Sequence, residues 1–273
     1  MKARTLAALI VALLALALAA CGDDDDDNGG GGAGELDTIR SGTLTVGSDI
    51  PFRPFEFGRA PDYDGFDIEL AREIANRLDL QLEIRDTPFD TIFRDLAQGR
   101  FDMVASATTI TDEREQTVDF SDPYYLADQA LLVQEGGDIR AVEDLAGATV
   151  GAQDGTTGAD YADEETDAEN VRTFEAYDDA FNALVAGQID AVIADLPAAR
   201  DAVEQKEGLE IAVELVTREL YGLAFQQDAD PLREEVNRVL GEMKQDGTYR
   251  RIFRKWFEEE PPEDVLNATH EPS

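Results

Sequence analysis

Apolar and polar positions follow a repeated pattern along the first half of the chain. Three short apolar runs predict strands, at 44–46, 82–84 and 103–105. Two longer segments between them predict helices, at 66–78, where apolar residues recur every four positions, and at 89–97. Strands that alternate with helices at this spacing indicate an α/β fold with a mostly parallel, helix-covered sheet.

The same pattern occurs a second time further along the chain. Strands are predicted at 148–152, 171–174 and 191–194, with a helix at 177–186. Leu96, Gly99 and Asp102 match Leu184, Gly187 and Asp190, each 88 positions later. This weak internal repeat suggests two similar α/β lobes in series.

The ends of the repeated strands indicate where a ligand could bind. In open parallel sheets, ligands lie outside the carboxyl ends of the strands. The two matching strands end at Ser106 and Asp195. If the lobes face each other, these ends are expected to meet at one cleft.

The C-terminal part predicts a strand and two helices. The apolar segment 221–225 is typical of a strand, and helices are expected at 231–244 and 249–257. Helical spacing places the aromatic residues of the last helix in the core. From Glu258 onward the chain is polar and contains prolines, so a frayed, flexible tail is expected over 261–273.

The N-terminal segment has the features of a lipoprotein signal peptide, assigned to residues 1–20. It combines two basic residues with an apolar run of 15 residues, shorter than the roughly 20 that a membrane-spanning helix needs. The segment Leu18–Cys21 resembles a bacterial lipobox, so Cys21 is the expected lipidation site. The alternative is a plain secretory signal with an incidental cysteine. Because Cys21 is the only cysteine, no internal disulfide is possible.

The next segment, 21–35, is rich in glycine and aspartate and predicts a flexible tether. Its aspartate run lacks the spaced carboxylates and turn glycine of a calcium loop, so we expect a solvated spacer and no metal site.

Composition excludes several functions. The chain has 60 acidic and 23 basic residues and a formal net charge of −37, which argues against nucleic acid or anionic membrane surfaces as partners. The segment GTTG lacks the lysine and spacing of a phosphate-binding P-loop, and no cofactor is expected. The only histidine is His270, and Cys21 is taken up by the anchor, which disfavours hydrolase or thiol chemistry.

Seven motifs occur in order between Thr43 and Phe257: VGSDIPFRPFEF, GFDIELAREIANRL, FDMVASATTITDERE, VDFSDPYY, VGAQDGTTGADYA, IDAVIADLPAA and DGTYRRIFRKWF. Together they resemble the family 3 bacterial extracellular solute-binding proteins, the amino-acid receptors of ABC importers. The resemblance implies the two-lobed, type II periplasmic-binding-protein fold, with two hinge strands and a ligand cleft between the lobes.

The resemblance also implies boundaries within the chain. Lobe 1 is expected at 36–125 and 222–260, lobe 2 at 130–217, and the hinge segments at 126–129 and 218–221.

Three residues of one loop are expected to hold the ligand's α-carboxylate. Arg114 occupies the position of the family's arginine, and a guanidinium makes two parallel hydrogen bonds with a carboxylate. Ser106 and Thr109 would add donors. The alternative for Arg114 is a surface ion pair with Asp112 or Glu115.

Two residues of the second lobe complete the predicted grip. Thr157 matches a position whose backbone N–H meets the carboxylate at a helix start, although GTTG alone favours a simple helix cap. Asp195 matches the family's ammonium ligand, and its alternative role is also a helix cap, ahead of Leu196-Pro197.

The remaining predicted contacts concern the ligand side chain. Phe52 and Phe89 match aromatic positions that sandwich it, with ordinary core packing as the alternative. Asp49 matches a position near its far end. Asp49 and Asp195 against Arg114 give a cleft charge of −1, which favours a polar or cationic side chain over an acidic one.

These observations predict a lipid-anchored receptor that binds a free amino acid and delivers it to an ABC permease. It is expected to be a monomer on the extracytoplasmic face of the membrane and not an enzyme. The alternatives are a periplasmic dehydratase-like enzyme on the same fold and a ligand sensor for a separate signalling chain.

Overall fold

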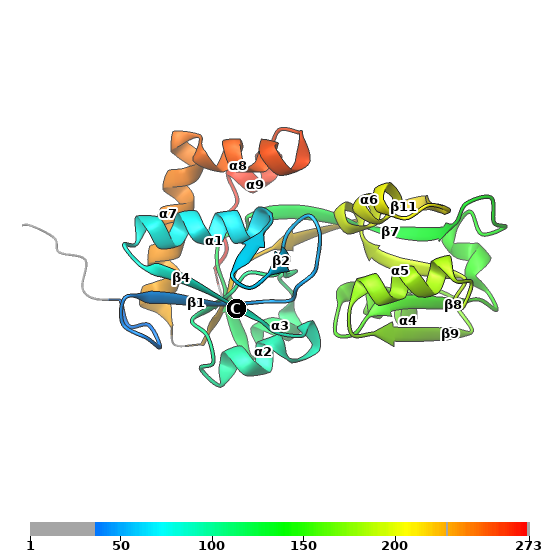
Figure 1. The fold of residues 1–273 in the computed structure, drawn as a ribbon, viewed down its shortest axis with the longest axis horizontal. Coiled ribbons are helices and arrows are strands. Elements are labelled where there is room, and N and C mark those ends of the chain that lie inside the picture. The colour runs from blue at the N-terminus through cyan, green and yellow to red at the C-terminus, as the bar shows by residue number, and fades with distance from the viewer. Residues whose placement is uncertain (1–35, 228, 272–273) are drawn as a thin grey trace, which may run out of the picture. The chain divides into compact units, whose positions relative to one another are not determined.

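The computed structural model describes residues 36–227 and 229–271, which build two five-stranded sheets (Figure 1). The first sheet has the order β4 (Gln81–Asp86), β1 (Thr43–Ser48), β5 (Met103–Val104), β12 (Ala224–Gln226) and β6 (Val118–Phe120). β1 is parallel to both β4 and β5, whereas β12 is antiparallel to its two neighbours. The chain therefore returns to its first sheet after it has built the second.

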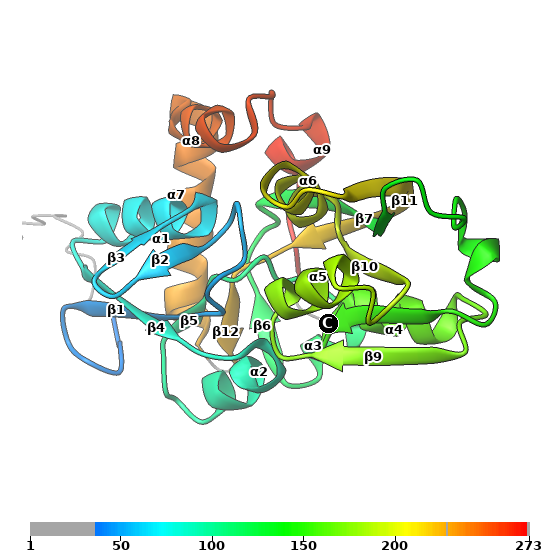
Figure 2. The same ribbon diagram turned by 45° about the vertical axis from the view of Figure 1, so that its right-hand side comes forward.

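Helices cover both faces of the first sheet. On one face lie α1 (Phe66–Arg77), α7 (Asp230–Asp246) and α8 (Thr248–Phe257), and on the other lies α2 (Phe89–Ala97) (Figure 2). The apolar residues that recur every four positions in α1 are buried against β1, as their spacing predicts. The short strands β2 (Phe57–Arg59) and β3 (Asp62–Asp64) form a hairpin ahead of α1.

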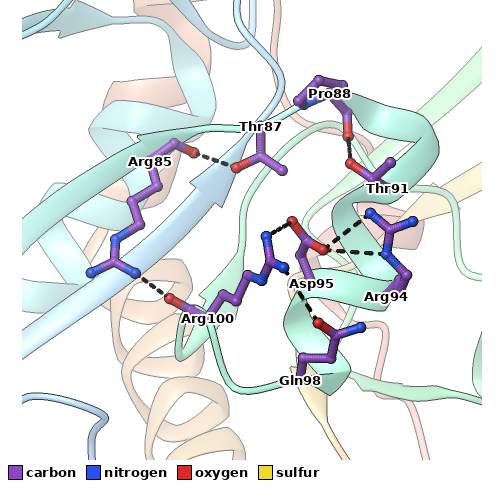
Figure 3. A network of polar contacts seen from close by, with 8 residues as sticks. All are labelled: Arg85, Thr87, Pro88, Thr91, Arg94, Asp95, Gln98 and Arg100. Carbon is purple, nitrogen blue, oxygen red and sulfur yellow. Dashed lines mark hydrogen bonds and ion pairs between the residues drawn. The ribbon is translucent and has the colours of Figure 1, made fainter.

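A polar network fixes α2 against the sheet (Figure 3). Asp95 of α2 accepts a hydrogen bond from Nη1 of Arg100 at 3.0 Å, and Arg85 of β4 donates to the carbonyl of Arg100 at 2.5 Å. The loop between α2 and β5 is thereby tied to α2 and to β4. Phe89, the first residue of α2, is buried.

The second sheet has the order β11 (Leu209–Tyr221), β7 (Tyr125–Gln134), β10 (Ala191–Asp195), β8 (Thr149–Gln153) and β9 (Asn170–Phe174). β8, β9 and β10 are parallel, whereas β7 is antiparallel to β10 and β11. The helices of this lobe are α4 (Thr157–Glu164), α5 (Tyr177–Val185) and α6 (Leu196–Gln205), with a 3₁₀ turn at Val142–Leu145.

Two long strands connect the lobes. β7 leaves the first lobe at Tyr125, and β11 returns to it at Tyr221, which pairs with Tyr125. The pairing is irregular between Leu215 and Glu219, so the returning strand bulges midway.

Two expectations differ from the structure. The apolar segment 221–225 is not one strand, because β11 ends at Tyr221 and β12 begins at Ala224. At Gly222 a Cβ atom would lie 3.0 Å from the side chain of Ile110, so the chain passes its neighbour closely here.

Residues 259–271, which include the described part of the expected flexible tail, are packed rather than frayed. A short helix, α9 (Glu263–Leu266), buries Val265 completely, and the Nζ of Lys244 donates to the Val265 carbonyl at 2.9 Å. His270 lies 2.7 Å from a carboxylate oxygen of Glu115. Polar composition predicts a loose tail, but the buried side chains of Pro261 and Val265 and a few polar contacts hold these residues.

The predicted signal peptide, the lipidation site Cys21 and the tether lie outside the described residues. Within the ranges 36–227 and 229–271, no helix combines the length and apolar character needed to cross a bilayer.

Candidate functional site

A cavity lies between the lobes at the carboxyl ends of strands from both sheets. Its free volume is about 10 Å³, close to the least that accommodates one water molecule. All eight predicted site residues line it: Asp49, Phe52, Phe89, Ser106, Thr109, Arg114, Thr157 and Asp195. Four further residues complete the lining: Ala107, Gln153, Thr156 and Tyr177. Because these side chains fill the space, a ligand as large as an amino acid requires the lobes to separate.

The loop after β5 forms the floor of the cavity. Ser106 is buried, and its hydroxyl donates to Oε1 of Glu56 at 2.7 Å and accepts from the N–H of Asp49 at 2.9 Å. Ala107 has a φ of 44°, a left-handed value that residues other than glycine rarely adopt. The N–H of Ala107 donates to Asp67 at 2.8 Å, and this bond helps to hold the strained turn.

Arg114 projects from the short helix α3 (Asp112–Glu115) and hydrogen-bonds with backbone carbonyls of both lobes. Nη1 donates to Thr109 O at 2.7 Å, and Nη2 donates to Gly155 O at 3.1 Å. The guanidinium carbon lies 5.3 Å from the ring centre of Phe89, within cation–π range. Glu115, one of the two ion-pair partners expected for a surface arginine, contacts His270 instead.

Thr157 is the first residue of α4, and Thr156 is its N-cap. The hydroxyl of Thr156 accepts from the N–H of Ala159 at 3.2 Å, so the cap predicted for GTTG is provided by Thr156. The N–H of Thr157 is among the first of the helix, which have no partner within it. Its hydroxyl donates to Oε2 of Glu219 at 2.6 Å.

Asp195 occupies the N-cap position of α6 but makes no side-chain cap hydrogen bond. Its carboxylate instead accepts from Nε2 of Gln129 at 2.5 Å. Burial, and then the negative charge of Glu219, raise the pKa of Asp195 to about 7. The carboxylate is therefore turned toward the cavity and away from the helix it precedes.

The opposite end of the cavity is closed by Asp49 and Gln153. Nε2 of Gln153 donates across the cleft to Asp49 at 2.5 Å and also to the carbonyl of Glu175 at 2.9 Å. Burial raises the pKa of Asp49 to about 7.

Aromatic rings form the side walls. Phe52 and Phe89 are both buried and both line the cavity, so core packing and contact with the cavity coexist. Phe52 lies 5.6 Å from Tyr177, ring centre to ring centre, across the lobes.

The sequence prediction did not include several polar residues at or beside the cavity, among them Tyr177, Gln129 and Glu219. Tyr177 follows a predicted strand at the same edge of the sheet as Asp195, so strand-end reasoning could have included it. Gln129 and Glu219 lie in segments predicted to be hinge. Glu219 is displaced by the bulge in β11, and no periodic pattern indicates its direction.

Comparisons with known proteins agree with this architecture. The ABC transporter glutamine-binding protein GlnH of Bacillus subtilis (strain 168) is 34% identical over 206 residues, 74% of this chain and 76% of that protein. The structure of the arginine-, lysine-, histidine-binding protein ArtJ from Geobacillus stearothermophilus has a TM-score of 0.78 at 34% identity, covering 82% of this chain and 99% of its own.

A further solved structure is the ancestral amino acid-binding protein AncCDT-1, described as a precursor of cyclohexadienyl dehydratase. It has a TM-score of 0.74 at 39% identity and covers 79% of this chain and 96% of its own. The fold is therefore the two-lobed, type II periplasmic-binding-protein fold. The family model described as bacterial extracellular solute-binding proteins, family 3, matches residues 44–259. The chain belongs to this family.

Proposed function

We propose that this protein is the extracytoplasmic receptor of an ABC importer and binds a free amino acid between its lobes for delivery to the permease. One observation carries the proposal: a guanidinium, a helix start and a buried carboxylate line the same interlobe cavity, through Arg114, Thr157 and Asp195. An amino acid has an α-carboxylate that suits the first two groups and an ammonium that suits the third.

Each of the eight predicted contact residues has a role in this proposal. Arg114, Ser106 and Thr109 hold the α-carboxylate from the first lobe, and the N–H of Thr157 meets it from the second. Asp195 pairs with the ammonium.

Phe52 and Phe89 pack against the ligand side chain, and Asp49 lies at its far end. Asp49 and Asp195 oppose a single guanidinium in the set of predicted contacts, which favours a polar or cationic side chain. The relatives named above, which bind glutamine or arginine, lysine and histidine, support this class.

Binding requires the lobes to open and close about the paired strands β7 and β11. We assign the hinge to 126–129 and 218–221, lobe 1 to 36–125 and 222–260, and lobe 2 to 130–217. The bulge in β11 borders the second hinge segment. Closing contacts would then favour the shut form when a ligand is bound.

The N-terminal sequence supports membrane anchoring. We propose that residues 1–20 are a signal peptide, that Cys21 carries the lipid, and that 21–35 tether a monomeric receptor to the extracytoplasmic face. Metabolic labelling with a lipid precursor should mark the protein, and Cys21→Ser should remove the label.

A dehydratase-like enzyme is the second candidate, favoured by the similarity to AncCDT-1 and by two buried carboxyl groups, Asp49 and Asp195, with pKa values of about 7. The other named relatives are described as binding proteins. A receptor releases its ligand unchanged, so NMR of the ligand after prolonged incubation should show no product.

The direct test is calorimetric titration with the common amino acids after a thermal-shift screen. Arg114→Ala should abolish binding while the folded spectrum is retained. Arg238→Ala is the matched control, because the only ion pairs of Arg238 among the described residues are with Glu235 and Glu242 of its own helix. Unchanged affinity in Arg114→Ala would reject the proposed carboxylate grip.

A further inference from the structure

Glu219 is directed toward the cleft by an irregularity in the returning strand β11. Leu215 pairs with Gln129, and Glu219 pairs with Ala127. Between these two pairs β11 advances by four residues and β7 by two, so β11 contains two extra residues. Arg218, inside this bulge, has a φ of 55°, which is rare for a residue with a side chain. Backbone strain of this kind is often kept where it serves function, which suggests that the direction of the following side chain, Glu219, has a functional role.

The carboxylate of Glu219 joins three threonines. Oε1 accepts from the hydroxyl of Thr217 at 2.9 Å, within the bulge itself. Oε2 accepts from the hydroxyl of Thr109 at 2.8 Å and from that of Thr157 at 2.6 Å. One carboxylate thus contacts both threonines of the proposed ligand grip, one from each lobe.

These contacts differ in what lobe opening would do to them. Thr109 forms a backbone bridge with Tyr221, and the N–H of Ile110 donates to the carbonyl of Leu220 at 2.8 Å, so this loop stays with the end of β11. Thr157 belongs to α4 of the second lobe, and among the described residues no backbone hydrogen bond joins it to β11. Thr109 and Thr217 therefore hold Glu219 in place, and Thr157 is the partner that closing adds.

Thr157 also connects this contact to the proposed ammonium site. Nε2 of Gln129, on the other hinge strand, lies 3.3 Å from the Thr157 hydroxyl and 2.5 Å from Oδ1 of Asp195. A line of hydrogen bonds therefore runs from Glu219 through Thr157 and Gln129 to Asp195. It joins the carboxylate end of the site to its ammonium end through both hinge strands.

We propose that Glu219 is a positioning residue that holds the closed cleft: it receives the Thr157 hydroxyl when the lobes shut and so sets the start of α4 against the loop that carries Thr109. This inference rests on the proposed function. Hydrogen bonds to a charged group are stronger than neutral ones, so the contact should act mainly on ligand release.

The test is a double-mutant cycle measured by calorimetry and stopped-flow release, with L-arginine, L-lysine, L-histidine and L-glutamine as probes. Glu219→Ala should weaken binding about 10- to 100-fold, the range for hydrogen bonds to a charged group, chiefly through faster release. Glu219→Gln keeps an acceptor oxygen for the threonines but carries no charge, so it should recover part of the affinity. Glu214→Ala removes an exposed charge from the same strand and should behave as wild type.

Thr157→Val removes the hydroxyl and keeps the backbone N–H, whereas Thr157→Ser keeps both. Combining Thr157→Val with Glu219→Ala should weaken binding by less than the product of the two single effects. Effects that multiply, or a Glu219→Ala variant that releases ligand at the wild-type rate, would overturn the inference. A wild-type protein that binds none of the amino acids tested would instead reject the proposed function.

Discussion

The replacement of Asp67 by Asn should change how stability depends on pH. Asp67 and Glu56 are both fully buried beneath the cleft floor. Asp67 Oδ2 accepts from Ala107 N–H at 2.8 Å and from the Tyr124 hydroxyl at 2.7 Å, and Glu56 accepts from Ser106. The other oxygen of each carboxyl group has no hydrogen-bond partner among the described residues.

Burial raises the pKa of Asp67 from 3.8 to about 6, and burial and the charge of Asp67 raise the pKa of Glu56 well above its usual value. The folded chain therefore binds more protons than the unfolded chain, and stability that is complete below pH 3.8 is lost as the pH rises through about 6. At about 1.4 kcal/mol per pKa unit, a rise of about two units corresponds to about 3 kcal/mol for Asp67.

The assay is urea unfolding of the ligand-free protein between pH 4 and pH 8. Asparagine can still accept both hydrogen bonds, but it carries no charge. At pH 4 the unfolded carboxyl group is already partly protonated, so the free energy of unfolding of Asp67→Asn, relative to wild type, should rise by about 2.5 kcal/mol from pH 4 to pH 8. The control is Asp62→Asn, at an exposed position of β3. Parallel pH profiles for wild type and Asp67→Asn would refute the reasoning.

Other predictions concern the backbone and the cleft. Gly65→Ala should cost more than about 3 kcal/mol in urea unfolding, because φ is 131° and the new Cβ would lie 2.0 Å from the Phe55 carbonyl oxygen. Gly241→Ala, in α7 with nothing within 4 Å, should instead add about 0.5–1 kcal/mol. Calorimetry from pH 5 to pH 8 should show affinity for a zwitterionic amino acid falling up to about tenfold per pH unit below 7, since Asp195 must lose its proton to pair with an ammonium. Asp195→Asn should bind weakly with a flatter pH profile, and a wild-type profile independent of pH would contradict this assignment.

Local sequence patterns predicted the helices in which apolar residues recur at regular spacing. The helix 89–97 begins and ends as predicted, and the apolar spacing from Phe66 identified α1. Strand ends indicated the cleft, because parallel strands bring their carboxyl ends to one edge of a sheet. Ser106 and Asp195 accordingly line one cavity.

The features that were missed depend on contacts between distant segments. Gly222 interrupts a continuous apolar run because the neighbouring Ile110 leaves it little room, and nothing in residues 221–225 records that neighbour. Burial of Pro261 and Val265 holds residues 259–271, whose composition is mostly polar. The direction of the Glu219 side chain follows from the shift in register between β11 and β7. The pattern of residues in one strand does not show how that strand pairs with another.

The charges around the cleft connect its closure to the choice of ligand. Asp49, Asp195 and Glu219 lie in or beside a cavity lined by one guanidinium, that of Arg114. Burial favours proton uptake, and the pKa values of Asp49 and Asp195 are about 7, so protons offset part of this negative charge near neutral pH. A ligand ammonium can replace the proton of Asp195, and a cationic side chain can replace that of Asp49. Glutamine has only its ammonium and so replaces only the proton of Asp195. A cationic amino acid should therefore release more protons on binding, and the ratio of its affinity to that of glutamine should grow as the pH rises.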